Sequence, residues 1–506
     1  MDKSHGMAAS SRPINAPQSR SFAGMFGRMF RELPAWEPDG ATETGKLASI
    51  LKIAAEMEEK IDTPKGDIDA IDGVPRIPAA YTFFGQFVDH DITFDPRSSL
   101  QKANDPDNLE DFRTPAFDLD NIYGRGPDDQ PYLYRREKHR KSLVLGEAKS
   151  ANDDKIKPVK DADLPRSADG TAIIGDMRND ENLLVSQLQL VFLKFHNKIV
   201  ADLAAKGMPD DRIFAEAQRL ARWHYQWVVI HDWLDRLCGS QIIHEILDIE
   251  GEGRFGRPKL MFYHFKEYPF MPVEFSVAAY RLGHSMMRNR YRIKDNRELP
   301  LFDLGKDDDS GEDLRGFQHI EPKNTVEWCH LLAFAGKDKA KVQASRKIDK
   351  FLCSPVIHMP DRVANPDDVA EPPVPPPEPI DDSRRSLAFR NLLRAYRLGL
   401  PSGQSVARRI GVKTNDILPG NTPLWRYMLD EASKFGKGNQ LGPVGCRITA
   451  EVFIGLLAAD PTSFYGTNST WTPATDPVLT IKPQDPKDPR AFQLRDIIAY
   501  AAPESI

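Results

Sequence analysis

The chain has few cysteines, no long hydrophobic run and no excess of basic charge, and each absence argues against a class of protein. Its cysteines stand far apart without a CxxC pair, which argues against a disulfide framework and against a zinc site. We therefore expect buried, reduced thiols at Cys238, Cys329, Cys353 and Cys446. No apolar run approaches the roughly 18–20 residues of a membrane span. A formal net charge of −6, with basic residues spread along the chain, argues against nucleic-acid binding.

The N-terminus also lacks the apolar stretch of a secretory signal. Residues 1–22 are polar and rich in small residues, so we expect a disordered arm there. These features predict a cytoplasmic protein, or one that is exported without a cleavable signal peptide. With 40% hydrophobic and 28% charged residues, the chain has the composition of a soluble globular protein.

Period-two alternation of apolar residues is almost absent, which predicts a mainly α fold with few short strands. We expect a single large helical domain over residues 76–465, between an N-terminal arm and outer segment (1–75) and a wrapping tail (466–506). The Pro-rich stretch 364–385 resembles a linker, but we interpret it as a surface loop, because candidate functional residues fall on both sides of it. Helical periodicity indicates helices within 46–60, 181–207, 211–238, 272–291, 386–400, 423–459 and 491–502.

Several polar residues end the aromatic stretch YTFFGQFVDHDITFDP, which begins at Tyr81. On a helix, Gln86 and His90 stand four apart and share one face, while Asp89 and Asp91 point to either side of it. The end of this helix would thus place an amide and an imidazole in a buried pocket. It would also place one carboxylate beside the pocket and the other carboxylate outside the pocket. A core histidine flanked by capping carboxylates would explain the same residues.

A loop with regularly spaced oxygen donors follows, in the sequence TPAFDLDNIYG. Thr114, Ala116, Asp118 and Asp120 alternate in position, and an extended loop aims such positions inward. Calcium takes about six to eight oxygen ligands, from carboxylates, hydroxyls and backbone carbonyls. Asp91 would complete this shell and tie its helix to the loop. A polar turn with an Asx cap is the alternative.

A third motif, GDMRNDEN, opens the longest predicted helix. Arg178 and Glu181 lie three apart and so on one helical face. An arginine that points into a dry pocket would stabilise charge developing on a bound oxygen. The alternative is structural, since Asn179 or Asp180 could cap the helix and Glu181 could be a capping-box partner.

Two further segments carry candidate chemistry. In YRLGHSMMRNRY, His284 follows a glycine and has apolar neighbours, as a core histidine would. In SLAFRNLLRAYRLGLPSG, Asn391, Arg394 and Arg397 stand at helical spacing, as they would on a solvated basic face.

Taken in chain order, these motifs resemble the animal-type heme peroxidases, the superfamily of myeloperoxidase, thyroid peroxidase and the cyclooxygenases. The resemblance spans residues 82–464, and the chain looks like a bacterial member of the peroxidase branch. It implies heme b between the central helices, bound Ca²⁺, and hydrogen peroxide as substrate. It also implies a small reducing donor, such as a halide, thiocyanate or a small aromatic compound, which is oxidised through a ferryl and porphyrin-radical state.

On the distal side of the heme, the resemblance assigns His90 as the distal histidine, Gln86 as its pocket neighbour and Arg178 as the distal arginine. These roles suit the residue types, because a neutral imidazole can move a proton between the two oxygens of a peroxide. Asp89 and Glu181 match the two carboxylates that form ester bonds to heme methyl groups.

On the proximal side, the resemblance assigns His284 as the iron ligand, Asn391 as its hydrogen-bond partner and Arg394 as a partner of a heme propionate. A hydrogen bond to the second ring nitrogen would tune the electron donation of such a ligand. The family's calcium shell is matched by Asp91, Thr114, Ala116 (through its carbonyl), Asp118 and Asp120.

Two positions depart from parts of this family. Asn182 stands where myeloperoxidase has a methionine that makes a third link to heme, so we expect at most two covalent links. Arg281 stands where the cyclooxygenases and fatty-acid dioxygenases place a radical tyrosine, and Tyr280 lies one residue further away. Fatty-acid dioxygenation is therefore the second hypothesis. A heme-free calcium-binding or adhesion protein on the same scaffold is the third.

Overall fold

The computed structural model describes residues 24–59, 70–71, 74–94, 109–150, 155–247, 249–250, 254–255, 258–265, 268–304, 312–360, 385–488 and 492–506. Over these residues the fold is mainly helical with a few short strands, which confirms the predicted fold class. The predicted arm 1–22 and nearly all of the predicted surface loop 364–385 lie outside them. The predicted division into arm, domain and tail stays a prediction.

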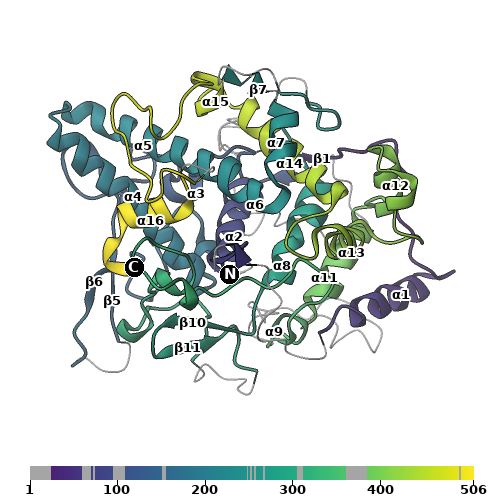
Figure 1. The fold of residues 1–506 in the computed structure, drawn as a ribbon. Helices are drawn as coiled ribbons and strands as arrows, with labels where there is room; N and C mark the ends of the chain where they lie inside the picture. The colour runs from purple at the N-terminus through teal and green to yellow at the C-terminus, as the bar shows by residue number, and fades with distance from the viewer. Residues whose placement is uncertain are drawn as a thin grey trace.

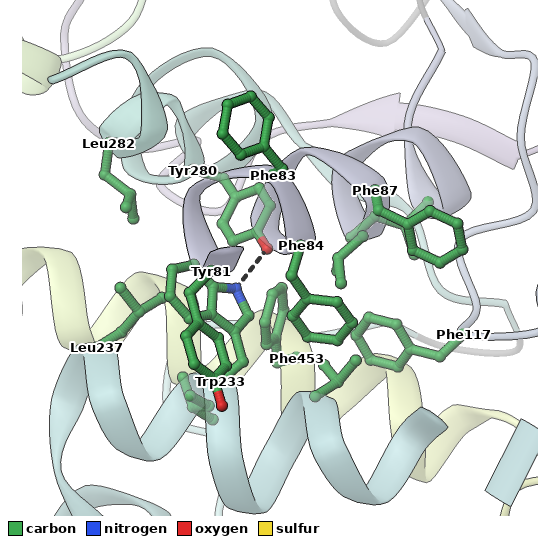
Figure 2. Close-up of a cluster of buried hydrophobic side chains, with 14 of the residues drawn as sticks. Tyr81, Phe83, Phe84, Phe87, Phe117, Trp233, Leu237, Tyr280, Leu282 and Phe453 are labelled. Carbon is green, nitrogen blue, oxygen red and sulfur yellow. Dashed lines mark hydrogen bonds between the residues drawn. The ribbon is translucent and has the colours of Figure 1, made fainter. Parts of the chain in front are cut away.

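Helix α2 (Ala80–Ile92) lies near the centre of the molecule (Figure 1). Its aromatic residues are buried and pack against the helices below it, and Tyr81 stacks on Trp233 with 5.8 Å between the ring centroids (Figure 2). Gly85 permits this approach, because a Cβ built there would lie only 2.9 Å from the Trp233 ring. The burial of the aromatic face fixes the direction in which the polar end of α2 points.

Two long helices cover one side of α2, namely α4 (Leu183–Ala205) and α5 (Asp210–Trp227). A π-helical stretch, η6 (Val228–Leu234), continues α5 into α6 (Asp235–Cys238). Both long predicted helices are therefore present, and the second has a π segment that its periodicity did not indicate.

The residue that caps the N-terminus of α4 is not one of those that the sequence suggested. The side chain of Asn182 accepts a hydrogen bond from Leu184 N at 2.9 Å and is the N-cap. The neighbouring Asn179 and Asp180 have other partners, and the Asp180 carboxylate receives two hydrogen bonds from the Arg166 guanidinium, at 2.6 and 2.7 Å. The suggestion that Asn179, Asp180 or Glu181 belongs to a cap of this helix is therefore wrong.

The segment around His284 is not the single helix that the sequence predicted. It consists of a π-helix, η7 (Glu274–Ala278), a 3₁₀ turn, η8 (Ala279–Leu282), and a short helix, α8 (Gly283–Met286). A strand then begins at Arg290. Such changes of helix type are frequent at functional sites and leave no regular period in the sequence.

The other described helices complete the fold around α2, α4 and α5 (Figure 1). The C-terminal helix α16 packs against α4, and Leu494 N donates a hydrogen bond to Asp232 at 2.9 Å. The larger of these helices are α1 (Glu43–Ala55), α11 (Leu387–Arg397), α13 (Leu424–Gly436), α14 (Pro443–Ala459) and α16 (Leu494–Ala501). The smaller ones are α3 (Asp120–Tyr123), α7 (Ser240–Leu247), α9 (Ser354–Ile357), α12 (Gly403–Arg409) and α15 (Phe464–Thr467).

The strands are short and lie at the periphery. β1 pairs antiparallel with β4 and parallel with β9, which joins residues from three distant parts of the chain. The others form antiparallel pairs, β2 with β3, β5 with β6, β7 with β8 and β10 with β11. The bounds are β1 (Gly24–Gly27), β2 (Ala70–Ile71), β3 (Val74–Pro75), β4 (Glu110–Asp111), β5 (Gly146–Ala148), β6 (Val159–Asp163), β7 (Ile249–Glu250), β8 (Arg254–Phe255), β9 (Met271–Pro272), β10 (Arg290–Lys294) and β11 (Arg297–Pro300).

All four cysteines are free thiols in the structure. Cys353 and Cys446 are buried as expected, but Cys238 and Cys329 are only half-buried. Among the described helices, none has both the length and the apolar character that crossing a bilayer would need.

Candidate heme site

The polar end of α2 faces a cavity whose walls come from three distant parts of the chain. Gln86, Asp89 and His90 line it from α2, Glu181 lines it from the residue before the α4 cap, and His284 lines it from α8. The structure thus brings these five predicted residues together around one space. Asp91 lies on the other side of α2, as its helical position predicted.

The proton on His90 is fixed by a chain of buried amides. Gln189 Nε2 donates to the backbone carbonyl of Asn121 at 2.9 Å, which leaves Gln189 Oε1 to accept from Asn179 Nδ2 at 2.8 Å. Asn179 therefore presents its oxygen to His90 Nδ1, at 2.7 Å. Since a backbone carbonyl can only accept, the whole chain has one orientation, with the proton on Nδ1 and a lone pair on Nε2.

The charge state of His90 agrees with this tautomer. Burial, assisted by the positive charge of Arg178, lowers the pKa of His90 to about 3. The imidazole is therefore neutral at pH 7, and its Nε2 is an available base. Nε2 lies 3.8 Å from Oε1 of Glu181, on the cavity side.

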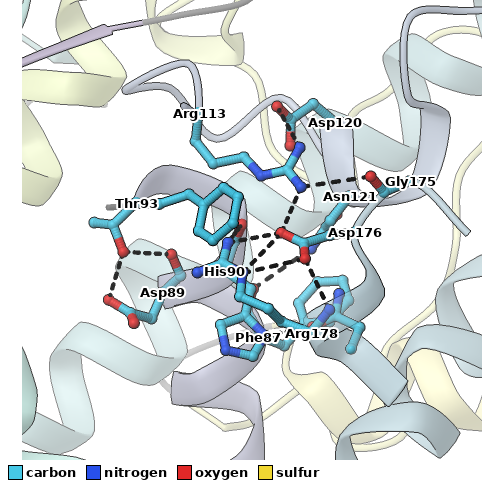
Figure 3. A network of polar contacts seen from close by, with 12 residues as sticks. Phe87, Asp89, His90, Thr93, Arg113, Asp120, Asn121, Gly175, Asp176 and Arg178 are labelled. Atoms are coloured by element: carbon cyan, nitrogen blue, oxygen red, sulfur yellow. Dashed lines mark hydrogen bonds and ion pairs between the residues drawn. The ribbon is translucent and has the colours of Figure 1, made fainter. Parts of the chain in front are cut away.

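Glu181 is held beside His90 by Gln86. The side-chain amide of Gln86 donates to Oε1 of Glu181. Burial raises the pKa of Glu181 to about 7, so this carboxyl is close to half-protonated at neutral pH. Asp89 is tied back to its own helix, because Thr93 Oγ1 donates to Asp89 Oδ1 at 3.1 Å (Figure 3).

The guanidinium group of Arg178 is anchored by two partners (Figure 3). Its Nη2 donates to the backbone carbonyl of His90 at 2.9 Å and to the carboxylate of Asp176 at 2.6 Å, and its Nε donates to the same carboxylate at 3.1 Å. Burial would raise the pKa of Asp176, but the charges of Arg113 and Arg178 outweigh it and hold that pKa well below its usual range. Arg178 lines a second cavity rather than the one that contains His90.

The opposite wall carries His284 and Asn391. Nδ2 of Asn391 lies 2.6 Å from Nδ1 of His284, so the predicted partner is within hydrogen-bond distance. Burial, assisted by the charge of Arg281, lowers the pKa of His284 to about 3, and a neutral imidazole can act as a metal ligand. A Cβ built on Gly283 would meet no atom within 4 Å, which leaves open space directly beside His284.

The second cavity adjoins the first through Arg281, which lines both. Arg178 and Arg394 also line it, so three arginines line one space. Guanidinium groups pair well with carboxylates. The residues present therefore fit heme: His284 would hold the iron, His90 would face it, and Arg281 and Arg394 would hold the propionates.

Three of the predicted calcium residues form a compact cluster, in which Asp91 is buried and Asp118 and Asp120 are half-buried. Carboxylate oxygens of Asp91, Asp118 and Asp120 lie within 4.8 Å of one another. One oxygen each of Asp91 and Asp120 is buried without a hydrogen-bond partner. Burial and the neighbouring carboxylates raise the pKa of Asp118 to about 8 and that of Asp91 well above its usual value. The donor set, carboxylate oxygens close together, fits calcium.

Thr114 and Ala116 belong to the loop that carries Asp118 and Asp120. Ala116 N donates to the Thr114 carbonyl at 2.8 Å, which gives this part of the loop a tight turn. Their part in a calcium shell stays a prediction.

Arg113 connects this acidic cluster to the distal side of the cavity. Its guanidinium forms ion pairs with Asp120 at 3.2 Å and with Asp176 at 2.5 Å (Figure 3). Asp176 in turn holds Arg178. The sequence motifs predicted no functional role for Arg113, Asp176 or Gln189, and they indicated Asn179 only as a cap. Asp176 and Asn179 lie inside the GDMRNDEN motif, whereas Arg113 and Gln189 had no local signal.

The two family departures have distinct environments. Asn182 is committed to capping α4, and its side chain accepts from Leu184 N. Tyr280 lines the cavity of His90 and His284, although it stands one residue away from the family position. Its hydroxyl accepts a hydrogen bond from Trp233 Nε1 at 2.8 Å (Figure 2).

A family model matches part of this chain. Residues 97–306 match the model described as Animal haem peroxidase, which is less than half of the chain. The matched region contains the predicted calcium loop, Arg178, Glu181 and His284, whereas His90 precedes it and Asn391 follows it.

Curated relatives are similar over part of the chain. A peroxidase-like protein from Margaritifera margaritifera is 27% identical over 41% of this chain and 31% of its own length. The chorion peroxidase of Aedes aegypti is 26% identical over 26% of this chain and 16% of its own length. The chain thus covers less than a third of the length of these relatives.

Solved structures share the fold over almost the whole chain. Peroxidase A from Dictyostelium discoideum has a TM-score of 0.55 at 14% identity, covering 90% of each chain. The fatty acid alpha-dioxygenase of Oryza sativa has a TM-score of 0.55 at 15% identity, covering 94% of this chain and 82% of the neighbour. At this identity the likeness establishes the peroxidase fold and leaves the substrate open.

Proposed function

We propose that this protein is a heme peroxidase that reduces hydrogen peroxide and oxidises a halide, thiocyanate or small aromatic donor. The observation that carries the proposal is the fixed tautomer of His90, which leaves Nε2 as a neutral base facing a cavity that His284 also lines. Heme, held through His284, would supply the redox chemistry. Reduction of one peroxide to two water molecules consumes two protons and two electrons, and the donor supplies the electrons.

The surrounding residues support each proton movement. Nε2 of His90 accepts a proton from the near oxygen of the peroxide and returns it to the departing oxygen. Asn179 keeps the other ring proton on Nδ1 throughout, so a single nitrogen performs both transfers. Arg178 places a fixed positive charge behind His90 and so favours return of the proton.

On the opposite wall, the ring nitrogen of His284 that carries the proton decides whether His284 can bind iron. For Nε2 of His284 to donate a lone pair to iron, Nδ1 must carry the proton and donate it to Asn391. Because Nδ2 of Asn391 faces Nδ1 in the structure, this role requires the Asn391 amide to turn over and present its oxygen. Arg394 and Arg281 would bind the propionates in the adjoining cavity. Asp89 and Glu181 line the first cavity and are the carboxyl groups available for ester links to heme.

A substitution of His90 tests the proposal. His90→Ala should retain heme, because the iron ligand is His284, and should lose most of the rapid peroxide reduction, measured by stopped-flow absorbance. His319→Gln is the control, since His319 is a half-buried histidine outside both cavities. Unchanged peroxide reduction in His90→Ala would disprove the assignment.

Tyr280 favours fatty-acid dioxygenation as a second candidate function. Tyr280 lies in the cavity wall, and its hydroxyl is hydrogen-bonded to Trp233. Radical chemistry on a bound fatty acid would need a tyrosine at such a place. Oxygen uptake after addition of a long-chain fatty acid, and its loss in Tyr280→Phe, would support this candidate. Peroxide reduction without any fatty-acid-dependent oxygen uptake would exclude it.

The bacterial origin and the cytoplasmic location implied by the sequence stay predictions. The same holds for the heme linkage and for calcium.

A further inference from the structure

A second group of metal-ligand side chains lies away from both cavities, beside the turn of the β10–β11 hairpin. Glu327, Cys329 and His330 present a carboxylate oxygen, a sulfur and a ring nitrogen within 4.8 Å of one another. Cys329 and His330 belong to the 3₁₀ turn η10 (Trp328–His330), and Asp295 of the hairpin turn faces them. The proposed peroxidase reaction uses none of these side chains.

His330 is the buried base of this group. Its side chain is 1% exposed, and neither ring nitrogen has a hydrogen-bond partner among the described residues. A buried imidazole that makes no hydrogen bond costs free energy, so native structures seldom retain one without a ligand. The orphaned nitrogen Nε2 faces two carboxylates.

The distances from Nε2 of His330 to the two carboxylates are too long for hydrogen bonds, but they fit ligands of one metal ion. Nε2 lies 3.5 Å from an oxygen of Asp295 and 3.6 Å from an oxygen of Glu327. Both exceed the usual hydrogen-bond range of about 2.7–3.2 Å. Ligands around a tetrahedral ion, with bonds of about 2.1 Å, are separated by about 3.4 Å. Nε2 is therefore separated from each of these carboxylates as two ligands of one ion would be, and the sulfur of Cys329 lies within 4.8 Å of His330 and Glu327.

The backbone of the group is already fixed. Glu327 N donates to the Ile293 carbonyl of β10 at 2.9 Å, and the His330 carbonyl accepts from Gln343 N at 2.8 Å. Trp328, between the candidate ligands, is buried. An ion would then need to order only the half-exposed side chains of Cys329 and Glu327, which keeps the entropic cost of binding low.

We propose that Glu327, Cys329 and His330 bind a divalent transition-metal ion of the zinc type. A thiolate, an imidazole and a carboxylate together suit Zn²⁺ and are a poor set for calcium, which prefers oxygen alone. Asp295 adds negative charge, although Lys341 forms an ion pair with it at 2.6 Å. The spacing argument against a zinc site considered only paired cysteines, and here a single cysteine stands between a glutamate and a histidine.

Zinc titration of the heme-loaded full chain tests the site. Isothermal titration calorimetry is run in buffer with excess calcium, so that the acidic cluster of Asp91, Asp118 and Asp120 is occupied. Wild type should bind one Zn²⁺ per chain. Cys329→Ser and Glu327→Gln should each weaken binding at least about tenfold, because each removes one of three ligands. Cys238→Ser is the matched control, since Cys238 is also half-buried but lies outside the group.

Cobalt gives a second measurement that does not depend on activity or on the stability of a buried-residue variant. A Co²⁺ difference spectrum should show a thiolate-to-metal charge-transfer band in wild type and in Cys238→Ser, and no such band in Cys329→Ser. Absence of Zn²⁺ binding to wild type, or equal affinity in wild type, Cys329→Ser and Glu327→Gln, would overturn the proposal.

Discussion

His90 depends on residues that do not line its cavity. Asn121, Gln189 and Asn179 form a hydrogen-bonded chain that ends at Nδ1 of His90, and both amide side chains in it are fully buried. The orientation of each amide follows from the backbone carbonyl at the start of the chain. A substitution in this chain therefore alters the base without touching the peroxide.

Replacing Asn179 should separate base strength from heme binding. In Asn179→Ala the proton on Nδ1 loses its acceptor, so the ring can rotate or present the wrong tautomer to the cavity. We expect the rate of peroxide reduction to fall about 10–100-fold, as for other residues that orient a functional imidazole, with heme content unchanged. Stopped-flow kinetics and the heme absorbance measure the two quantities.

The conservative variant Asn179→Asp distinguishes orientation from general damage. It keeps an acceptor for the Nδ1 proton of His90 but loses the donor to Gln189 Oε1, so it should recover part of the lost rate. If Asn179→Ala and Asn179→Asp are equally slow, or if both lose heme, the proposed role of Asn179 is wrong.

Asp89 and Glu181 are expected to determine how tightly heme is retained. After turnover with peroxide, wild-type heme should resist acid–butanone extraction and appear on the tryptic peptides that contain these two carboxyl groups. Each of Asp89→Asn and Glu181→Gln should remove one link, and the double variant should release all of the heme. Because Asn182 is occupied as a helix cap, no third link is expected. Complete extraction of heme from the peroxide-treated wild type would contradict the ester prediction.

At the scale of elements, the sequence predicted best where one regular period continues for many residues. The helices α4 and α5 follow from their apolar spacing, and the burial of their faces agrees with it. The segment around His284 was predicted as one helix but contains three short helical types in succession. Its shape depends on packing against α13 and α14, which local periodicity does not describe.

The candidate site was predictable in part for the same reason. Residues such as Gln86 and His90 share one helix, so helical spacing alone places them on one face. Arg113 enters the site by pairing with Asp176, which is distant in the chain, and Gln189 enters it by pairing with Asn179 across the start of α4. No local pattern indicates such partners, because they are selected by the tertiary fold.

The junction between α13 and α14 provides a test at this scale. Glu431 of α13 is fully buried, and its carboxylate accepts a hydrogen bond from Val444 N at the start of α14, at 2.9 Å. Its second oxygen has no partner, and burial raises the pKa of Glu431 to about 7. The folded protein therefore holds a proton here that the unfolded chain releases near pH 4.5.

This difference sets the sign of a pH effect. Below pH 4.5 Glu431 is protonated in both states, and between pH 4.5 and 7 only the folded state keeps the proton, so its contribution to stability is lost as the pH rises. Glu431→Gln mimics the protonated form, so its stability advantage over wild type should grow across this window to about 3 kcal/mol. Denaturant unfolding at several pH values measures it. Glu245→Gln, on the exposed side of the same region, is the control, and its stability difference from wild type should not change with pH in this way. If the stability difference between Glu431→Gln and wild type stays constant from pH 4.5 to 7, the predicted effect is absent.

At the scale of the whole molecule, contacts between distant segments hold the site in place. Near the N-terminus, Met29 N and Phe30 N donate to the carboxylate of Glu274 in η7, at 3.0 and 3.1 Å. Near the C-terminus, Leu494 N donates to Asp232, which also pairs with Arg236. The fold neighbours cover at least 90% of this chain, whereas the family sequence model covers residues 97–306. The architecture that holds the site therefore extends well beyond the segment recognised by sequence.

Calcium removal should reveal how the acidic cluster acts on the distant cavity. Without a cation, the closely spaced carboxylates of Asp91, Asp118 and Asp120 would repel one another. Arg113 forms ion pairs with both Asp120 and Asp176, and Asp176 holds Arg178, so a shift of Asp120 would reach the cavity. EGTA should therefore lower the melting temperature by a few degrees and slow peroxide reduction, and added calcium should restore both. Asp118→Asn should melt lower than wild type and respond little to EGTA, whereas Asp128→Asn, an exposed neighbour outside the cluster, should behave like wild type. If EGTA changes neither the melting temperature nor the rate, and elemental analysis finds no calcium in the purified protein, the cluster is not a calcium site and its carboxylates must be neutralised by protons.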